Sequence, residues 1–394
     1  MPPGLSDRAL VAFTLSASIA STIGGLPFNA LPVMLGSLAD SFALDPQAVG
    51  LMGSVCFAGY LAGTLVAPLW INRMNWRVLT AASATGTAAS FALSAQVSGV
   101  TMLYAVWALI GFFASTMTSL GMRILSDLPN KVRAYGVRQG VELSVTAAVL
   151  FALPPLVIAG WKYPGAALAL AGVVAVLGLS ALWVPEHPLV PVEPGAGGSP
   201  ARRALPARSW ACMAVFFVFL AGNIALWAFL ERIGTGLKIV AGEMGLVFAV
   251  LKLLGGAAAF SVAWIGERGG HRLPYWAVLA GIALGLGLLV SAQSFLPFAL
   301  GAWIWEFAFT CGCVYQAAAI ARSDPRGRAV MLVPAVFALG SMIGPGVAGQ
   351  LAAGGSYGGV LGLAAACSVV PALAYTWWQP DGSGVQRRGA RAGA

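Results

Sequence analysis

Charged residues are scarce in this sequence: 22 basic and 13 acidic residues occur among 394, which is 9% of the chain. Soluble globular domains carry about 25% charged residues. So few charges cannot cover a water-soluble fold, which excludes soluble enzymes, nucleic-acid-binding proteins and disordered chains. Histidine is rarer still, with two residues. A membrane enzyme built on clustered His and Asp is therefore disfavoured, and we expect no enzymatic activity.

Cysteine is also sparse, and its placement argues against a disulfide framework. All five cysteines lie inside apolar runs, where small buried residues are expected. Cys311 and Cys313 resemble a Cys-x-Cys metal motif, but residues two apart on a helix point to different faces. No Gly-rich loop ends in Gly-Lys-Ser/Thr, the pattern of a phosphate-binding loop. We therefore expect neither a metal nor a cofactor.

Long apolar runs dominate what is present, since 59% of the residues are hydrophobic. The strands of a β-barrel alternate polar and apolar residues, whereas these runs are continuous. A spanning helix needs about 20 apolar residues. The sequence thus predicts an all-α membrane protein with twelve transmembrane helices in two six-helix halves. The expected spans are 9–36, 48–71, 78–96, 101–124, 139–159, 164–184, 209–231, 243–265, 274–293, 296–320, 329–352 and 357–378.

One segment between the sixth and seventh spans has a different composition. Residues 185–208 contain six prolines and three arginines, and proline at this density blocks helix and sheet. We predict an extended cytoplasmic linker there, between an N-terminal half at 1–184 and a C-terminal half at 209–378. The polar, basic end at 379–394 is predicted to be a cytoplasmic tail.

The basic residues predict the orientation of the chain. With both termini in the cytoplasm, nearly all of them lie in inner loops or at inner helix ends. Only Lys162, Arg232 and Lys238 fall in outer loops, and Lys252 falls within a span. This is a strong positive-inside bias. Abundant Arg, Ala and Gly favour a bacterial gene, so we expect a multi-pass protein of the bacterial inner membrane.

The two halves of the sequence repeat when the chain is shifted by 195 residues. Glycine matches are common in a chain with 50 glycines, but basic residues that match in corresponding loops are informative. Such a parallel repeat is expected when two six-helix halves are related by an axis along the membrane normal. The basic matches are Arg73 with Arg268, Arg77 with Arg272, Lys131 with Arg326, and Arg133 with Arg328.

The loops after the second and eighth spans resemble the G-x-x-x-D-R-x-G-R-R signature of the major facilitator superfamily. The match is good over 263–272, with Glu267 at the acidic position, whereas 68–77 carries Asn72 there. The resemblance implies two six-helix halves, a central cavity and alternating access. It also makes these loops candidates for a gating latch, with anchoring at the inner surface as the alternative role. The latch candidates are Asn72, Arg73, Arg77, Glu267, Arg268 and Arg272.

Charges inside spans are the best candidates for function, because each costs about 2.5–3.5 kcal/mol at mid-membrane. Glu306 lies about 15 Å deep in the tenth span, and Lys252 lies at a similar depth in the eighth. The family resemblance places the tenth helix on the cavity wall and the eighth beside it. We expect these two residues to pair, either as a structural ion pair or as a substrate and proton site.

Further candidates for substrate or coupling contacts occur in other spans. Glu142 and Arg123 lie nearer the cytoplasmic ends, and Glu142 has Arg138 one turn away as a structural partner. Uncharged candidates could orient a ligand or bond to a neighbouring helix. They are Asn29, Asn223, Tyr315 and Gln316. Trp227 could form an apolar wall for a substrate or belong to the interfacial aromatic belt.

These features favour a secondary active transporter, monomeric in the lipid bilayer, that moves a small organic solute by alternating access. Lys252 in an apolar cavity favours an anionic substrate, and Glu306 or Glu142 could carry a coupling proton. An alternative is export of a drug or metabolite by proton antiport. A non-transporting sensor or assembly factor of the same fold is a third hypothesis, disfavoured by the buried charges. No nucleic-acid partner is expected.

Overall fold

The computed structural model describes residues 7–71, 73–129, 131–189, 205–265, 272–324, 329 and 332–378. Within these residues every regular element is helical, as the apolar runs predict. Most of the predicted linker and the whole basic tail lie outside them.

The described part of the first half contains seven α-helices and two short helical segments of other types. Its first span is divided into two helices, and its fifth span continues into a π-helix. The elements are α1 (Asp7–Asn29), α2 (Leu31–Phe42), α3 (Pro46–Ile71), α4 (Trp76–Ser94), α5 (Val100–Ser126), α6 (Lys131–Ala152), the π-helix η1 (Leu153–Ile158), α7 (Ala159–Gly178) and the 3₁₀ helix η2 (Leu179–Leu182).

The second half contains one α-helix for each predicted span, with bounds close to the predicted ones. The helices are α8 (Ala207–Gly236), α9 (Ala241–Ile265), α10 (Leu273–Ser291), α11 (Phe295–Ser323), α12 (Val333–Leu351) and α13 (Gly358–Trp378).

The break in the first span follows from proline chemistry. Pro32 lies at the start of α2 and has no N–H to donate to the carbonyl of Phe28, four residues earlier. The helix is therefore interrupted at Ala30, and the Phe28 carbonyl needs another donor. The two prolines of η1, Pro154 and Pro155, act in the same way on the fifth span, where the helix widens into a π-turn.

Ten stretches of the described residues are long and apolar enough to cross a membrane, and two features raise this to twelve. The stretch Ala134–Leu182 has 49 residues, about 74 Å of helix, which exceeds twice the bilayer core. It reverses at Lys162, where φ is 51°. Helix α4 is less apolar because it contains several Ser and Thr residues. The hydroxyls of Thr80 and Thr87 donate to backbone carbonyls one turn earlier, so they are satisfied within the helix.

The structure of the two halves follows the repeat found in the sequence. Shifting α3 by 195 residues places it on α9, and shifting α5 places it on α11. The contacts repeat as well: α4 packs on α5 and α7, and their equivalents α10, α11 and α13 pack on one another in the same way. The twelve spans therefore form two equivalent six-helix bundles.

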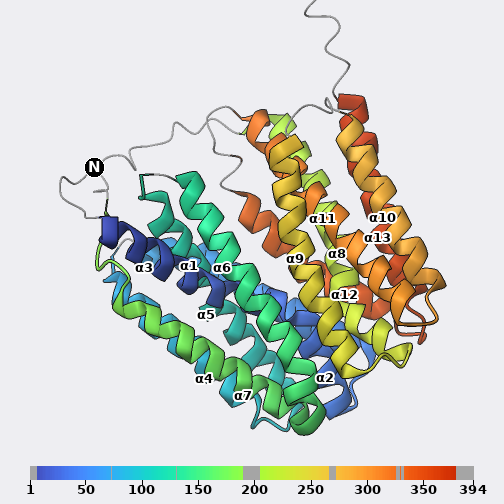
Figure 1. Cartoon of the computed structure of the whole chain (residues 1–394), viewed down its shortest axis with the longest axis horizontal. Helices are drawn as coiled ribbons and strands as arrows, with labels where there is room; N and C mark the ends of the chain where they lie inside the picture. Colours follow the sequence, from blue (N-terminus) through green and yellow to red (C-terminus); the bar gives the residue numbers. More distant parts are fainter. Residues whose placement is uncertain are drawn as a thin grey trace, which may run out of the picture.

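The halves meet through two symmetric pairs of helices, α3 with α12 and α6 with α9, and also through α2 with α8. We call the end of the bundle where α1 and α8 begin the terminal end, and the opposite end the far end (Figure 1). At the far end Gln47 bonds to Gln350 over 3.2 Å. A Cβ on Gly50 would collide with the backbone of Pro345 and Gly349. The halves are thus in direct contact at the far end.

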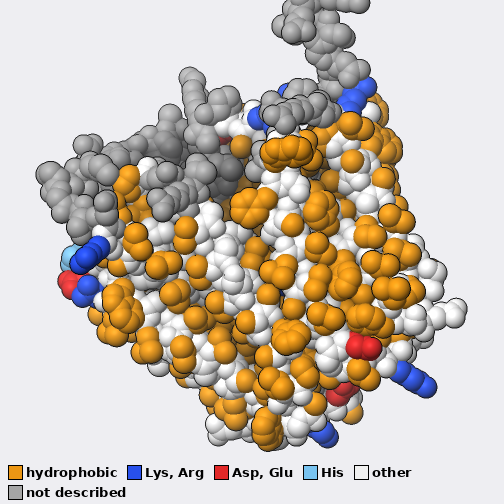
Figure 2. All heavy atoms as spheres, in the orientation of Figure 1, with side chains coloured by type: hydrophobic (Ala, Val, Ile, Leu, Met, Phe, Trp, Pro, Cys, Tyr) orange, Lys and Arg blue, Asp and Glu red, His pale blue; other side chains and the backbone are white. Residues whose placement is uncertain are grey.

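The outer surface is that of a membrane protein. Figure 2 shows apolar side chains spread over the face of the bundle, with Lys, Arg, Asp and Glu near its edges. Many large apolar side chains are exposed, including Leu65, Phe260 and Trp264. A bilayer would cover such a surface, because a soluble protein rarely exposes so large an apolar area.

Candidate functional site

Lys252 and Glu306 lie in contact near the middle of the C-terminal half. The Lys252 Nζ is 3.8 Å from the Glu306 Oε1, and the two side chains are only 5% and 8% exposed. Each residue is eleven positions into its helix from the far end, about 17 Å along α9 and α11. The pairing expected from the sequence is present, while its role stays a prediction.

The ammonium of Lys252 is enclosed by aromatic rings from both halves. Its Nζ lies 3.8 Å from the centroid of the Trp227 ring and 5.7 Å from that of Phe28. The Trp227 indole N–H donates to the Phe28 carbonyl over 2.9 Å. In the part of the chain that the structure describes, no hydrogen bond reaches the Lys252 ammonium. Its three donors are therefore available to a ligand.

A second polar cluster lies in the N-terminal half, on α1 and α6. Glu142 accepts a hydrogen bond from Arg138 over 2.6 Å and another from the side-chain amide of Asn29 over 3.2 Å. The Arg138 Nε donates to the Ser21 hydroxyl over 2.7 Å. Gly25 leaves room for the Glu142 carboxylate, because a Cβ at position 25 would collide with the Glu142 side chain. The expected Arg138–Glu142 pair is present, and it is joined by two residues of α1.

The two clusters act on one another electrostatically. Both Glu306 in its own half and Glu142 in the other half attract the charge of Lys252. The lysine lies near the plane where the halves meet, because its ammonium faces Phe28 of the N-terminal half and Trp227 of the C-terminal half. Relative motion of the halves changes the distance from Lys252 to Glu142, whereas Lys252 and Glu306 belong to the same half. The electrostatic environment of Lys252 can therefore respond to that motion.

Asn223 forms a bonded network inside the C-terminal half and leaves little for a substrate. Its amide donates to the Phe219 carbonyl over 2.9 Å and to the Ser368 hydroxyl over 3.0 Å. Its carbonyl accepts from the Trp305 indole over 2.9 Å. These bonds join α8, α11 and α13. The geometry favours the alternative of helix-to-helix bonding for this residue.

Tyr315 and Gln316 lie on different sides of α11. Tyr315 is nine residues from Glu306, which is half a turn away at 100° per residue, and it lines a groove on the outside of the bundle. Gln316 is fully buried, and its amide oxygen and nitrogen have no hydrogen-bond partner among the described residues. Of this pair, only Gln316 remains a candidate for the interior.

Arg123 lies at the terminal end of α5, away from both clusters. It pairs with Asp127 one turn later and donates to the Ser126 hydroxyl over 3.2 Å. Its guanidinium lies 5.8 Å from the centre of the Trp76 ring. Asp127 also accepts from the backbone N–H of Leu189, which leads into the linker. These contacts brace the end of the N-terminal half.

Arg77, one of the latch candidates that the structure describes, contacts residues of its own half. Arg77 pairs with Glu186 over 2.9 Å and donates to the Val184 carbonyl over 2.8 Å, which fixes the chain that leads into the linker. Arg73 is exposed, and Arg272 precedes α10. The remaining candidates lie outside the described residues: Asn72, Glu267 and Arg268.

Sequence reasoning missed a polar contact between the halves at the far end. Arg232 of α8 forms an ion pair with Asp40 of α2 and lies 3.4 Å from the Gly36 carbonyl. The neighbouring Glu231 packs against Gly36, where a Cβ would collide with its carboxylate. The partners are more than 190 residues apart, and no local spacing connects them. The clustering of Glu231 and Arg232 at a helix end was the one available signal.

Comparison with known proteins agrees with this architecture. The nucleoside transporter NupG superposes with a TM-score of 0.72 at 15% identity, covering 92% of this chain and 98% of that one. A bacterial homolog of the human lysosomal transporter Spinster, inward-facing and unoccupied, gives 0.66 at 14% identity, covering 95% and 97%. Its inward-facing, occupied form gives 0.70 at 15% identity, with the same coverage.

These likenesses at low identity establish the fold, and the family follows from the sequence. No curated protein matches the chain. The family model of the Major Facilitator Superfamily matches residues 15–322, well over half of the sequence. The resemblance that the loop signature indicated is confirmed. The chain belongs to the Major Facilitator Superfamily and is a multi-pass membrane transporter.

Proposed function

We propose that this transporter carries a small organic anion by alternating access and that Lys252 binds the anionic group. The observation that carries the proposal is the buried ammonium of Lys252, which has no hydrogen-bond partner among the described residues and lies where the halves meet. A buried charge with unused donors is costly unless a ligand or a conformational change uses them.

Glu306 is the carboxylate best suited to carry a coupling proton. At 3.8 Å its contact with Lys252 is an ion pair without a hydrogen bond, so a substrate carboxylate can displace it. A carboxylate left unpaired at this depth is most cheaply carried in its neutral form. Glu142 is held more firmly, because Arg138 and Asn29 both donate to it. Substrate binding at Lys252 would therefore be accompanied by proton uptake at Glu306.

The contacts between the halves support the alternating-access part of the proposal. Arg232–Asp40 and the close backbone contact at Gly50 both hold the far end closed. The substrate would then enter and leave this state from the terminal end. Transport requires these contacts to separate when the halves rock in the opposite direction.

The test is a thermal-stability screen of the purified protein against small monocarboxylates, dicarboxylates and organic phosphates. Nucleosides serve as the uncharged compounds of the screen, because the structurally similar NupG is a nucleoside transporter. A ligand that binds only the folded state raises the melting temperature. We expect anionic compounds to stabilise the wild type and to lose this effect in Lys252→Ala. Stabilisation by neutral nucleosides alone, unchanged in Lys252→Ala, would overturn the anion proposal.

A further inference from the structure

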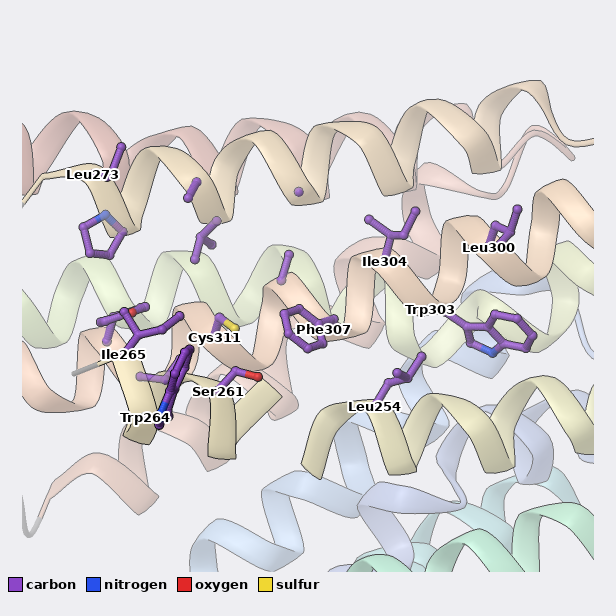
Figure 3. A pocket seen from close by; sticks show the side chains of 17 residues that line it. Leu254, Ser261, Trp264, Ile265, Leu273, Leu300, Trp303, Ile304, Phe307 and Cys311 are labelled. Atoms are coloured by element: carbon purple, nitrogen blue, oxygen red, sulfur yellow. The ribbon is translucent and has the colours of Figure 1, made fainter. Parts of the chain in front are cut away.

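A large groove lies on the outside of the C-terminal half, between α9, α10 and α11. Its volume is about 770 Å³, and Figure 3 shows side chains of the three helices directed into a common space. Leu300 and Trp303 line it toward the far end, and Trp264 and Leu273 line it toward the terminal end. The groove runs along α11 from Leu300 to Tyr315, about 22 Å at 1.5 Å per residue.

This groove is separate from the buried ion pair, although the same helices carry both. Leu254 lines the groove two residues after Lys252, and Tyr315 lines it nine residues after Glu306. At 100° per residue, both positions lie on the opposite face of their helix from the charged residue. The charges therefore face the interior, and the groove faces outward.

Several polar side chains that line the groove are engaged within the protein. The Ser261 hydroxyl donates to the Ala257 carbonyl over 2.8 Å, and the Trp303 indole donates to the Val247 carbonyl over 3.0 Å. The Cys311 thiol lies 3.8 Å from the Ala258 carbonyl. A polar ligand would find few groups to bond and would lose its hydration. The lining suits a flexible hydrocarbon chain.

The groove is continuous with the surface that contacts the bilayer. Trp264 is 76% exposed and Leu273 65% exposed, and both stand at its edge. The helices that form it are among those long and apolar enough to span a membrane. One leaflet contributes roughly 15 Å of a hydrocarbon core about 30 Å thick. A groove of about 22 Å therefore accommodates a chain that enters from one leaflet.

We infer that this groove binds one acyl chain of a bilayer lipid, held between α9, α10 and α11. The proposal does not depend on the substrate of the transporter, because neither Lys252 nor Glu306 lines the groove. The ligand class is a fatty acyl chain, selected by apolar contact and shape.

Trp303 is a natural reporter, because it lines the groove and is only partly exposed, whereas Trp264 contacts any surrounding lipid. The experiment places the full-length protein in nanodiscs of phosphatidylcholine with brominated or unbrominated acyl chains. Bromine quenches indole emission on contact. The emission of Trp303 is the difference between the wild type and Trp303→Phe, and that of Trp264 is obtained from Trp264→Phe.

We expect brominated chains to quench Trp303 to a degree similar to Trp264. Ala277 lines the groove and is exposed, so Ala277→Phe should fill it and reduce the quenching of Trp303 several-fold. Ala280→Phe is the matched control, since Ala280 is exposed on the same helix outside the groove. Thermal melting verifies that each variant is folded.

Two results would overturn the inference. Trp303 could keep its full emission while Trp264 is quenched, which would mean that no chain enters the groove. A water-soluble anion or nucleoside from the stability screen could also relieve the quenching of Trp303 by displacing the acyl chain, which would make the groove a solute site instead.

Discussion

The indole N–H of Trp227 donates a hydrogen bond to the backbone carbonyl of Phe28 across the boundary between the two halves, over 2.9 Å. This carbonyl is free because Pro32 has no N–H to offer it. One side chain of α8 thus completes a broken helix of the other half, and its ring also covers the Lys252 ammonium. The proline break and the buried charge are therefore parts of one arrangement.

The first prediction tests this hydrogen bond. Trp227→Phe should lower the free energy of unfolding by about 1–3 kcal/mol, because a buried carbonyl loses its donor. Pro32→Ala restores a backbone N–H that can reach Phe28, so the cost of Trp227→Phe should be about 1 kcal/mol smaller in that background. A double-mutant cycle by thermal unfolding measures the difference. Equal costs in both backgrounds would show that Trp227 acts through packing alone.

The second prediction concerns the buried ion pair. Lys252→Ala should destabilise the protein by about 3 kcal/mol, because it leaves Glu306 without its partner, and Glu306→Ala in the same chain should recover much of this. Lys238→Ala, at an exposed lysine, should change stability by less than about 0.5 kcal/mol.

Substrate binding to the folded double variant distinguishes a structural pair from a site. If Lys252 binds the anion, the double variant should melt near the wild-type temperature and fail to respond to the carboxylates that stabilise the wild type. Wild-type affinity in this protein would contradict a direct role for both residues.

The third prediction concerns closure of the far end. Gly50→Ala should force α3 and α12 apart, because the added Cβ collides with the backbone at Pro345. Gly242→Ala is the control, since a Cβ there meets nothing within 4 Å. Spin labels at exposed Gln96 and Ser294, in a cysteine-free background, report the distance between the halves at this end. It should lengthen in Gly50→Ala only, and an unchanged distance would mean that this contact does not hold the far end shut.

The fourth prediction concerns the linker at 185–208, which we predict from the sequence to be cytoplasmic. A single protease cut there should leave two fragments that purify together, because α3 with α12 and α6 with α9 hold the halves in contact. In right-side-out vesicles the segment should be protected, and in inverted vesicles it should be cut. Cleavage only in right-side-out vesicles would reverse the predicted orientation.

Much of the fold could be predicted because its causes are local in the chain. Runs of about 20 apolar residues specify spanning helices, and matching basic loops 195 residues apart indicate a repeated bundle. The Arg138–Glu142 contact followed from helical spacing, since residues four apart lie on one face. The Lys252–Glu306 contact followed from equal depth in two helices that the family resemblance places side by side.

The tertiary structure alone decided the contacts between the two halves and the partners of several buried polar groups. Phe28 and Trp227 are 199 residues apart, and no pattern in the chain couples the carbonyl freed by Pro32 to a particular indole. The sequence places the polar Asn223 inside an apolar span. Only the packed structure shows that its side chain forms hydrogen bonds with residues of α11 and α13. The physical reason is range: hydropathy and helix period act over neighbouring residues, whereas these contacts depend on how whole helices of two separate bundles are rotated against one another.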